Sequence, residues 1–326
     1  MPTTMLNSTV IEDAVRAACR APSLHNSQPW SWMLDGRRLQ LFLDPSRVMT
    51  TDRFARQALI SCGVALDHLR VAMAAAGWQC HIDRFPDAAD PDHLASIRFT
   101  PAESVSDHDR RRAEALSTRR TDRLPFNRPA DWNSVEKSVV AAVGDMPVQL
   151  DILPDEARSQ LVSATQLADS LRFYDIPYQN EIHWWAAPFE AEEGIPYSAL
   201  VSAEEGERVG IDRAFPHTHQ SERRAEIPED HAMILLLSTA HNARTDALAA
   251  GEALSVVLLE ATISGLATCP VTHLTELSVT RDLIRSLVDG DAVPQALIRV
   301  GVAPVTDSTP VPTPRRPLAK VLRVKS

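Results

Sequence analysis

Two long apolar helices are the feature that most constrains how this chain can fold. The sequence predicts them over 52–76 and 245–265. Each holds one glycine 14 residues before the glycine that ends it: Gly63 before Gly77, and Gly251 before Gly265. A glycine inside a helix costs ~1 kcal/mol relative to alanine, so its use at the same place twice predicts close approach of another backbone. Two central helices that cross there would supply that contact, although helices rich in Ala and Leu also align by chance.

The elements around these helices form two passes of a similar pattern. For the first pass we expect a helix over 10–20, which a Thr9/Glu12 capping box begins and Pro22 ends. We expect strands over 38–43, 80–84 and 96–100, and a second helix over 110–120. For the second pass we expect a helix over 132–143, capped by Asn133 or Ser134, and strands over 148–153, 233–238 and 294–304. Asp52 and Thr245 are the expected caps of the two long helices. The pattern predicts an α+β fold of two fused halves, 1–115 and 116–326, with mixed or antiparallel sheets around central helices.

One segment, 173–229, fits neither pass. It holds 8 of the 17 aromatic residues, and the prolines at 177, 188, 196 and 216 keep it from being one regular element. Segments this long without a strong pattern are usually functional covers or disordered linkers. Its aromatic content argues against disorder, so we predict an insert that packs as a lid over a site.

The composition indicates a globular protein and argues against some classes of partner. With 44% hydrophobic and 23% charged residues, the chain is typical of a soluble globular protein. A formal charge of −10 argues against nucleic acid or an anionic membrane as a partner. The four cysteines are scattered, which favours reduced thiols. No leader pattern and no apolar run near ~18 residues is evident, so the expected location is the cytoplasm.

The densest group of hydrogen-bonding side chains follows the first helix, over 21–32. Ser23, His25, Asn26 and Gln28 would suit a flat heteroaromatic ligand, while a polar loop that only satisfies its own turns is the alternative. The run Ala-Pro-Ser-x-x-Asn-x-Gln-Pro-Trp resembles the flavin-binding loop of the FMN-dependent nitroreductase superfamily. The resemblance implies a nitroreductase-like fold and flavin contacts from Ser23, Asn26 and Gln28, with His25 beside them.

A second group is the arginine-rich run 118–126. Arg119, Thr121 and Arg123 alternate, so an extended segment would present all three to one anion, although a solvated charged face is the common explanation. The run resembles the family motif Arg-x-Ser-x-Arg/Lys, with Thr in place of Ser. That resemblance implies that these three side chains hold the flavin phosphate and ribityl chain.

Two further resemblances lie near the C-terminus. The run Pro270, Val271, Thr272 and His273 resembles the turn whose backbone N–H groups face flavin N5, although the family often has Glu-Gly at the last two positions. Arg315 and Arg316 match the basic residues that return to the phosphate, with a solvated basic tail as the alternative.

The distribution of these motifs resembles the mycobacterial Acg-type branch, in which a single chain would imitate the family's usual homodimer as a monomer. The loop lies in the first half and the other motifs in the second, which implies one FMN per chain. The family implies hydride transfer from NAD(P)H through FMN to a nitroaromatic or quinone substrate, and no side chain is expected to act as a catalytic nucleophile. A protein that stores flavin under a closed lid, and a regulatory protein without flavin, are the alternatives.

The sequence lacks the common motifs of nucleotide-binding proteins, zinc proteases and serine hydrolases. The sequence has no G-x-G-x-x-G, P-loop, H-E-x-x-H or G-x-S-x-G pattern. His217 and His219 form an H-x-H pair, which is more often solvated than metal-bound, so no metal is expected.

Overall fold

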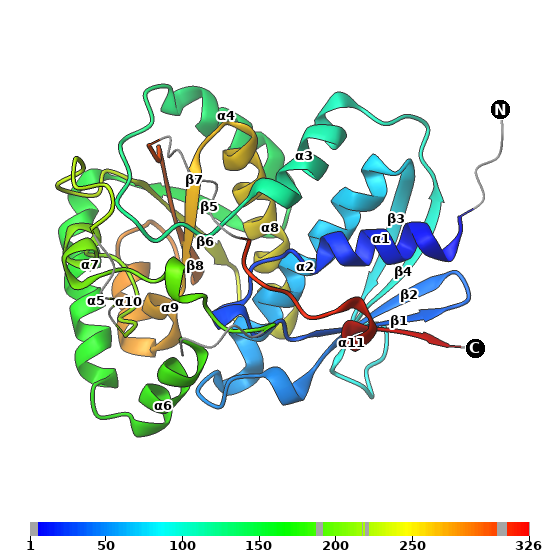
Figure 1. Ribbon diagram of the computed structural model, residues 1–326, viewed down its shortest axis with the longest axis horizontal. Helices are drawn as coiled ribbons and strands as arrows, with labels where there is room; N and C mark the ends of the chain where they lie inside the picture. The colour runs from blue at the N-terminus through cyan, green and yellow to red at the C-terminus, as the bar shows by residue number, and fades with distance from the viewer. Residues whose placement is uncertain (1–5, 187–191, 217, 219–221, 305–311, 326) are drawn as a thin grey trace.

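The computed structural model describes residues 6–186, 192–216, 218, 222–304 and 312–325. Its centre is the pair of helices α2 (Arg56–Ala75) and α8 (Arg244–Ile263), which lie between two sheets (Figure 1). A Cβ on Gly63 would overlap the carbonyl oxygen of Leu248, and one on Gly251 would overlap that of Ile60. Each added Cβ would also lie 2.9 Å from the Cα of the opposite glycine. The predicted close approach of two central helices is confirmed.

The first sheet has the order β3-β4-β2-β1-β9. Its strands are β1 (Trp30–Asp35), β2 (Arg38–Leu43), β3 (Trp78–Arg84), β4 (His93–Pro101) and β9 (Leu322–Lys325). All neighbours pair antiparallel except β1 and β9, which are parallel, with Trp32 opposite Leu322. The end of the chain therefore crosses from the second half to complete the sheet of the first (Figure 1).

The second sheet is antiparallel throughout and has the order β5-β6-β8-β7. Its strands are β5 (Gln149–Leu153), β6 (Met233–Thr239), β7 (Ala267–Val271) and β8 (Val293–Gly301). Every residue of β6 is buried, which fits a continuous apolar run in an inner strand. The predicted α+β fold with mixed and antiparallel sheets is confirmed, while the division at 115/116 remains a prediction.

The other helices cover the sheets and the central pair. They are α1 (Ser8–Ala18), α3 (Asp107–Thr118), α4 (Trp132–Val143), α5 (Arg158–Arg172), α6 (Ile176–Trp185), α7 (Ala203–Val209), α9 (His273–Glu276), α10 (Ser278–Arg285) and α11 (Leu318–Val321). Short 3-10 turns are η1 (Leu24–Asn26), η2 (Pro45–Arg47), η3 (Arg53–Ala55), η4 (Asp155–Ala157) and η5 (Tyr197–Ala199).

Several predicted helix caps are wrong. The first helix begins at Ser8, because the Asn7 side chain accepts a hydrogen bond from the Val10 amide. Asp131 and Ala243, not Asn133, Ser134 or Thr245, precede α4 and α8. Asp52 does serve the start of α2, since its carboxylate accepts hydrogen bonds from the amides of Gln57 and Ala58 across η3.

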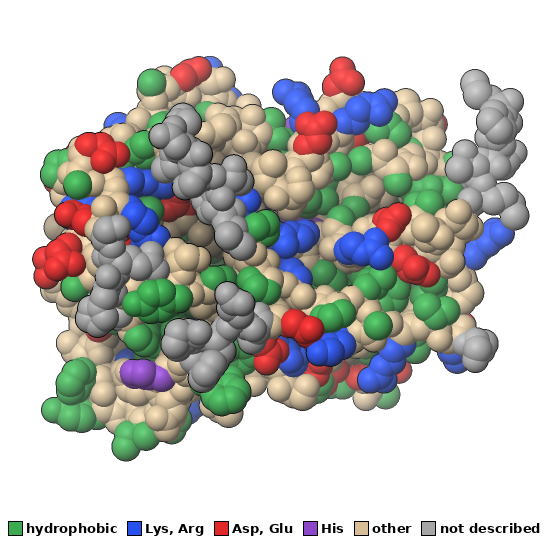
Figure 2. Space-filling model, in the orientation of Figure 1, with side chains coloured by type: hydrophobic (Ala, Val, Ile, Leu, Met, Phe, Trp, Pro, Cys, Tyr) green, Lys and Arg blue, Asp and Glu red, His purple; other side chains and the backbone are tan. Residues whose placement is uncertain are grey.

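The insert is only partly packed. Its helix α6 buries Tyr178 and Ile182, but Tyr174 and Trp184 are 87% and 71% exposed. Figure 2 shows hydrophobic side chains gathered over α6 at the lower left. Phe189 lies outside the described residues.

The helical stretch Arg53–Ala75 corrects the expectation that nothing in the chain could span a membrane. By length and composition alone this stretch of 23 residues could cross one, since a window of 18 residues in it has a mean hydropathy of 1.4. However, 78% of that window is buried inside the protein, where the helix forms the central pair with α8. A buried core helix passes the same test, so the finding is weak evidence for a membrane span.

Candidate functional site

A cavity with about 760 Å³ of empty space, part of it open to solvent, lies where the two predicted halves meet. We call it the larger cavity. The first half contributes the loop around Ser23 and one side of α2, and the second contributes the end of β7, part of α8 and the insert. Its lining residues are Pro22, Ser23, Leu24, His25, Gln57, Ile60, Ser61, Val64, Thr121, Arg123, Asp212, Arg213, Phe215, Leu254, Cys269, Pro270, Val271, Thr272 and His273.

A second cavity of about 520 Å³ adjoins it and shares Pro22, Ser23, Thr121 and Arg123. We call it the arginine cavity, because Arg20, Arg119, Arg120, Arg123 and Arg315 all line it. Asn26 and Thr313 complete its polar wall. Together the two cavities form one site. Its lining is partly polar and partly apolar in the larger cavity and strongly basic in the arginine cavity.

The loop that enters both cavities has an unusual backbone. His25, Asn26 and Gln28 have φ angles of 51°, 59° and 54°, in the left-handed region that residues with a side chain rarely adopt. The Ser23 hydroxyl accepts a hydrogen bond from the Gln28 amide at 2.9 Å, which closes the loop. Left-handed residues of this kind cluster at binding sites, where the surrounding structure holds them.

Arg119 is a buried cation without a hydrogen-bond partner at two of its nitrogens. It follows the last turn of α3 and is only 5% exposed, and its Nε and Nη1 have no partner among the described residues. Burial, with Arg20 and Arg120 nearby, lowers the pKa of Arg119 to about 10. An unpaired buried charge is costly, so this guanidinium favours a bound anion.

Asn26 and Arg315 complete the same end of the site. Asn26 Nδ2 donates to the carbonyls of Gly194 (3.0 Å) and Pro314 (3.1 Å), while its buried Oδ1 has no partner in the described part of the chain. Arg315 donates to the carbonyls of Cys19 (2.9 Å) and Arg20 (3.1 Å) at the end of α1. Burial and the neighbouring arginines lower the pKa of Arg315 to about 9.

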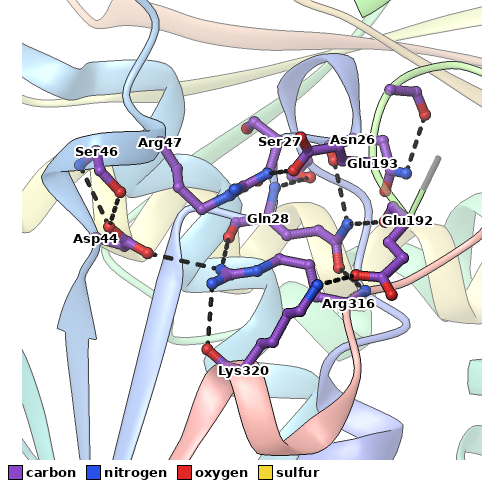
Figure 3. A network of polar contacts seen from close by, with 12 residues as sticks. Asn26, Ser27, Gln28, Asp44, Ser46, Arg47, Glu192, Glu193, Arg316 and Lys320 are labelled. Carbon is purple, nitrogen blue, oxygen red and sulfur yellow. Dashed lines mark hydrogen bonds and ion pairs between the residues drawn. The ribbon is translucent and has the colours of Figure 1, made fainter.

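Two of the sequence-predicted residues lie outside both cavity linings. Gln28 donates through Nε2 to the Glu192 carbonyl (2.9 Å) and accepts from the Arg316 amide (2.9 Å). Arg316 Nη1 in turn donates to the Gln28 carbonyl and lies 3.6 Å from Asp44 (Figure 3). These side chains therefore join the loop to the insert and the C-terminal segment.

The end of β7 and the start of α9 place Pro270, Val271, Thr272 and His273 together in the larger cavity. His273 is buried, with Nε2 3.3 Å from the Thr165 hydroxyl. Burial, and then the charge of Arg213, lowers the pKa of His273 well below its usual value. His25 is affected in the same way by burial, Arg213 and Arg123, so both imidazoles are neutral at pH 7.

Several lining residues were not predicted from the sequence. Arg20 and Arg120 line the arginine cavity, and Gln57, Asp212, Arg213 and Phe215 line the larger one. Phe215 meets the His25 ring edge to face, with centroids 5.7 Å apart, and the Arg123 guanidinium lies 5.3 Å from its centroid. The aromatic content of the insert pointed to this segment, but no local motif marks these positions.

Within the described ranges, no group of three or more His, Cys, Asp or Glu residues could hold an ion. His217 and His219 lie outside those ranges.

Comparison with known proteins gave clear relatives but no matching family model. The chain is 50% identical over 327 residues to the Mycobacterium tuberculosis protein named "Putative NAD(P)H nitroreductase acg", covering 100% of this chain and 99% of that one. It is 36% identical to Rv3131 of the same species, which carries the same designation, over 99% of this chain and 93% of the relative.

Two solved structures are more distant. The FMN-dependent nitroreductase NfnB from Mycobacterium smegmatis, in complex with NADPH, is 15% identical with a TM-score of 0.42, over 68% of this chain and all of that one. A nitroreductase with bound FMN from Bacteroides fragilis is 14% identical with a TM-score of 0.35, over 61% of this chain and 94% of that one. Both scores are low, so neither structure can locate individual residues here.

Proposed function

Since the chain belongs to the nitroreductase family, in the branch that contains mycobacterial Acg, we propose that it binds one FMN across the two joined cavities and uses NAD(P)H to reduce a nitroaromatic or quinone. The resemblance seen in the motifs is confirmed by the full-length identity to Acg. We also propose a cytoplasmic location, as expected from the sequence.

One observation carries the proposal: the two unpartnered buried nitrogens of Arg119 lie at the basic end of a site whose other end is wide and partly apolar. An FMN phosphate would supply the missing acceptors, and Asn26 Oδ1 would gain a donor from a ribityl hydroxyl. Five arginines line this end of a chain whose formal charge is −10. The basic end is therefore a local feature suited to an anion.

The residues of the larger cavity fit a flavin ring. FMN supplies the hydride chemistry when bound, so the chain has to bind, orient and shield it. Thr121 and Arg123 line both cavities and would hold the ribityl chain between them. Residues 271–273 would present backbone N–H groups to the ring, since Pro270 has none, and the neutral His25 and His273 add no competing charge.

A single binding site per chain is also part of the proposal. Ser23, His25 and Asn26 come from the first half, while Arg119, Thr121, Arg123, Arg315 and the turn at 270–273 come from the second. One chain would then provide what two subunits usually provide, and would work as a monomer. We expect one FMN per 35.9-kDa chain, measurable from the flavin absorbance of the purified protein.

Anaerobic reduction tests the activity. NADPH or NADH added without oxygen should bleach the flavin absorbance near 450 nm, and a quinone should restore it. Dithionite serves as the control, since it reduces accessible and shielded flavin without a nicotinamide site. A protein that takes up no FMN would contradict the whole proposal.

Storage of flavin without turnover is the second candidate, and contacts of the insert favour it. Glu181 accepts hydrogen bonds from the hydroxyls of Thr50 (2.9 Å) and Thr51 (2.6 Å), while Phe215 occupies the larger cavity wall. An insert held in this position would fill the space that nicotinamide needs. Bleaching by dithionite but not by NADPH or NADH would select this function.

A further inference from the structure

We propose that Asp212 is the acid that gives a proton to the substrate oxygen during reduction in the larger cavity. The inference rests on the proposed reductase function and names a catalytic residue for it. Asp212 follows α7 in the insert and lines the cavity. Among the described residues that form the cavity wall, it is the only carboxyl group.

The Asp212 carboxyl is not engaged in the framework of the protein. Within the described parts of the chain it makes no hydrogen bond and no ion pair, unlike Asp230, whose carboxylate pairs with Arg299 at 2.6 Å. Oδ2 of Asp212 lies near Gly206 of α7, where an added Cβ would be 3.8 Å away. A half-buried acid without a structural partner is free to exchange its proton with a ligand.

The surroundings keep this carboxyl partly protonated at neutral pH. Burial is the main cause, and the nearby carboxylates of Asp169 on α5 and Asp230 act in the same direction. Arg299 on β8 and Arg123 oppose them, and the balance raises the pKa of Asp212 to about 7. General acids work best when their pKa lies near the working pH.

The other ionisable groups of the cavity cannot take this role. His25 and His273 are neutral, because burial and the neighbouring arginines lower their pKa values. Arg123 and Arg213 keep their protons at neutral pH. Burial raises the pKa of the Cys269 thiol, which makes it a poorer acid.

The step balances for a quinone. The quinone gains a hydride in the reductase reaction and becomes a hydroquinone monoanion. The O–H bond of Asp212 breaks, a new O–H bond forms on the anionic oxygen, and neutral hydroquinone results. Asp212 is left as a carboxylate that the charges of Arg299 and Arg123 stabilise, and then takes a proton from water.

Reoxidation of pre-reduced holoprotein tests the step without nicotinamide. The FMN-loaded protein is reduced by one equivalent of dithionite and mixed anaerobically with 1,4-benzoquinone, and the return of flavin absorbance is followed from pH 5 to 9. We expect the wild-type rate to fall above pH of about 7. Asp212→Asn should be slower on the order of 100-fold at pH 6 and should lack this fall. Equal rates and equal pH profiles for the two proteins would overturn the inference and leave the reductase function standing.

An infrared titration gives a readout that does not depend on activity. The wild-type protein, with or without FMN, should show a protonated-carboxyl C=O band that disappears near pH of about 7 and is missing in Asp212→Asn. Asp169→Asn is the matched control, since Asp169 is a nearby half-buried acid outside the cavity lining. It should keep the band and the fall in rate, both moved to lower pH, because one of the carboxylates that raise the pKa of Asp212 is lost. A band that survives in Asp212→Asn would reject the assignment even if the protein bound no flavin.

Discussion

Arg119 shows what one residue can reveal about a ligand. Among the described residues its buried Nε and Nη1 have no acceptors, so Arg119 costs free energy that a bound anion would offset. We predict that Arg119→Ala weakens FMN binding about 10- to 150-fold, from ~1.5 to 3 kcal/mol for a charge-assisted bond. A fluorescence titration with FMN measures it. Arg128→Ala is the control, because Arg128 lies in the same arginine-rich region but pairs with the exposed Asp155.

The stability of the apoprotein adds a second test of the same residue. Without FMN, removing an unpaired buried charge should leave the free energy of unfolding unchanged or higher. If Arg119→Ala instead unfolds the apoprotein and leaves FMN affinity intact, the arginine is structural and the phosphate lies elsewhere.

Individual site residues were predictable only where a motif marked them. Asn26 and Arg119 belong to recognisable runs, and both line the arginine cavity. The left-handed backbone at His25 and Asn26 was not predictable, since neither position is glycine. Asp212 and Phe215 are brought to the cavity by the path of the insert, which no local pattern in the sequence records.

At the scale of elements, the contact between α2 and α8 depends on Gly63 and Gly251, which carry a hydrogen atom where other residues carry a side chain. We predict that Gly251→Ala lowers the free energy of unfolding by about 1 to 3 kcal/mol, because the new methyl meets the Ile60 carbonyl and forces the helices apart. This loss outweighs the ~1 kcal/mol gain in helix propensity. Urea unfolding measures it. Gly206→Ala in α7 is the control, since its added Cβ would meet its neighbours only at 3.7 and 3.8 Å and should be neutral or stabilising.

The spacing of apolar residues predicted those helices and strands whose own sequence alternates between buried and exposed positions. The strand over 38–43 was predicted with its observed bounds. Helix α5 was missed although Leu161, Ala164, Thr165 and Ala168 follow the helical spacing of buried positions. Strand β9 could not be found in this way: three of its four residues are exposed, and only its pairing with β1 makes it a strand.

At the scale of the whole molecule, polar contacts attach the insert to the first half of the chain and to its C-terminal segment. Glu193 pairs with Arg47, whose Nε also donates to the Ser27 carbonyl, and Glu192 pairs with Lys320 at 2.7 Å (Figure 3). The two ion pairs join segments more than 120 residues apart, so only the folded structure reveals them. If the insert controls access to FMN, they stabilise the closed arrangement.

Weakening this attachment should speed the exchange of FMN. We predict that Glu193→Gln raises the rate of FMN release about 2- to 5-fold, as expected for loss of a partly exposed ion pair worth ~0.5 to 1 kcal/mol, and that added salt has a similar effect on the wild type. Recovery of free-flavin fluorescence after dilution measures the rate. Asp35→Asn is the matched control, because it breaks the exposed pair with Lys325 at the β1–β9 edge and touches no part of the insert. Equal release rates in Glu193→Gln, Asp35→Asn and the wild type would mean that FMN leaves without movement of the insert, and the storage function would then lose its physical basis.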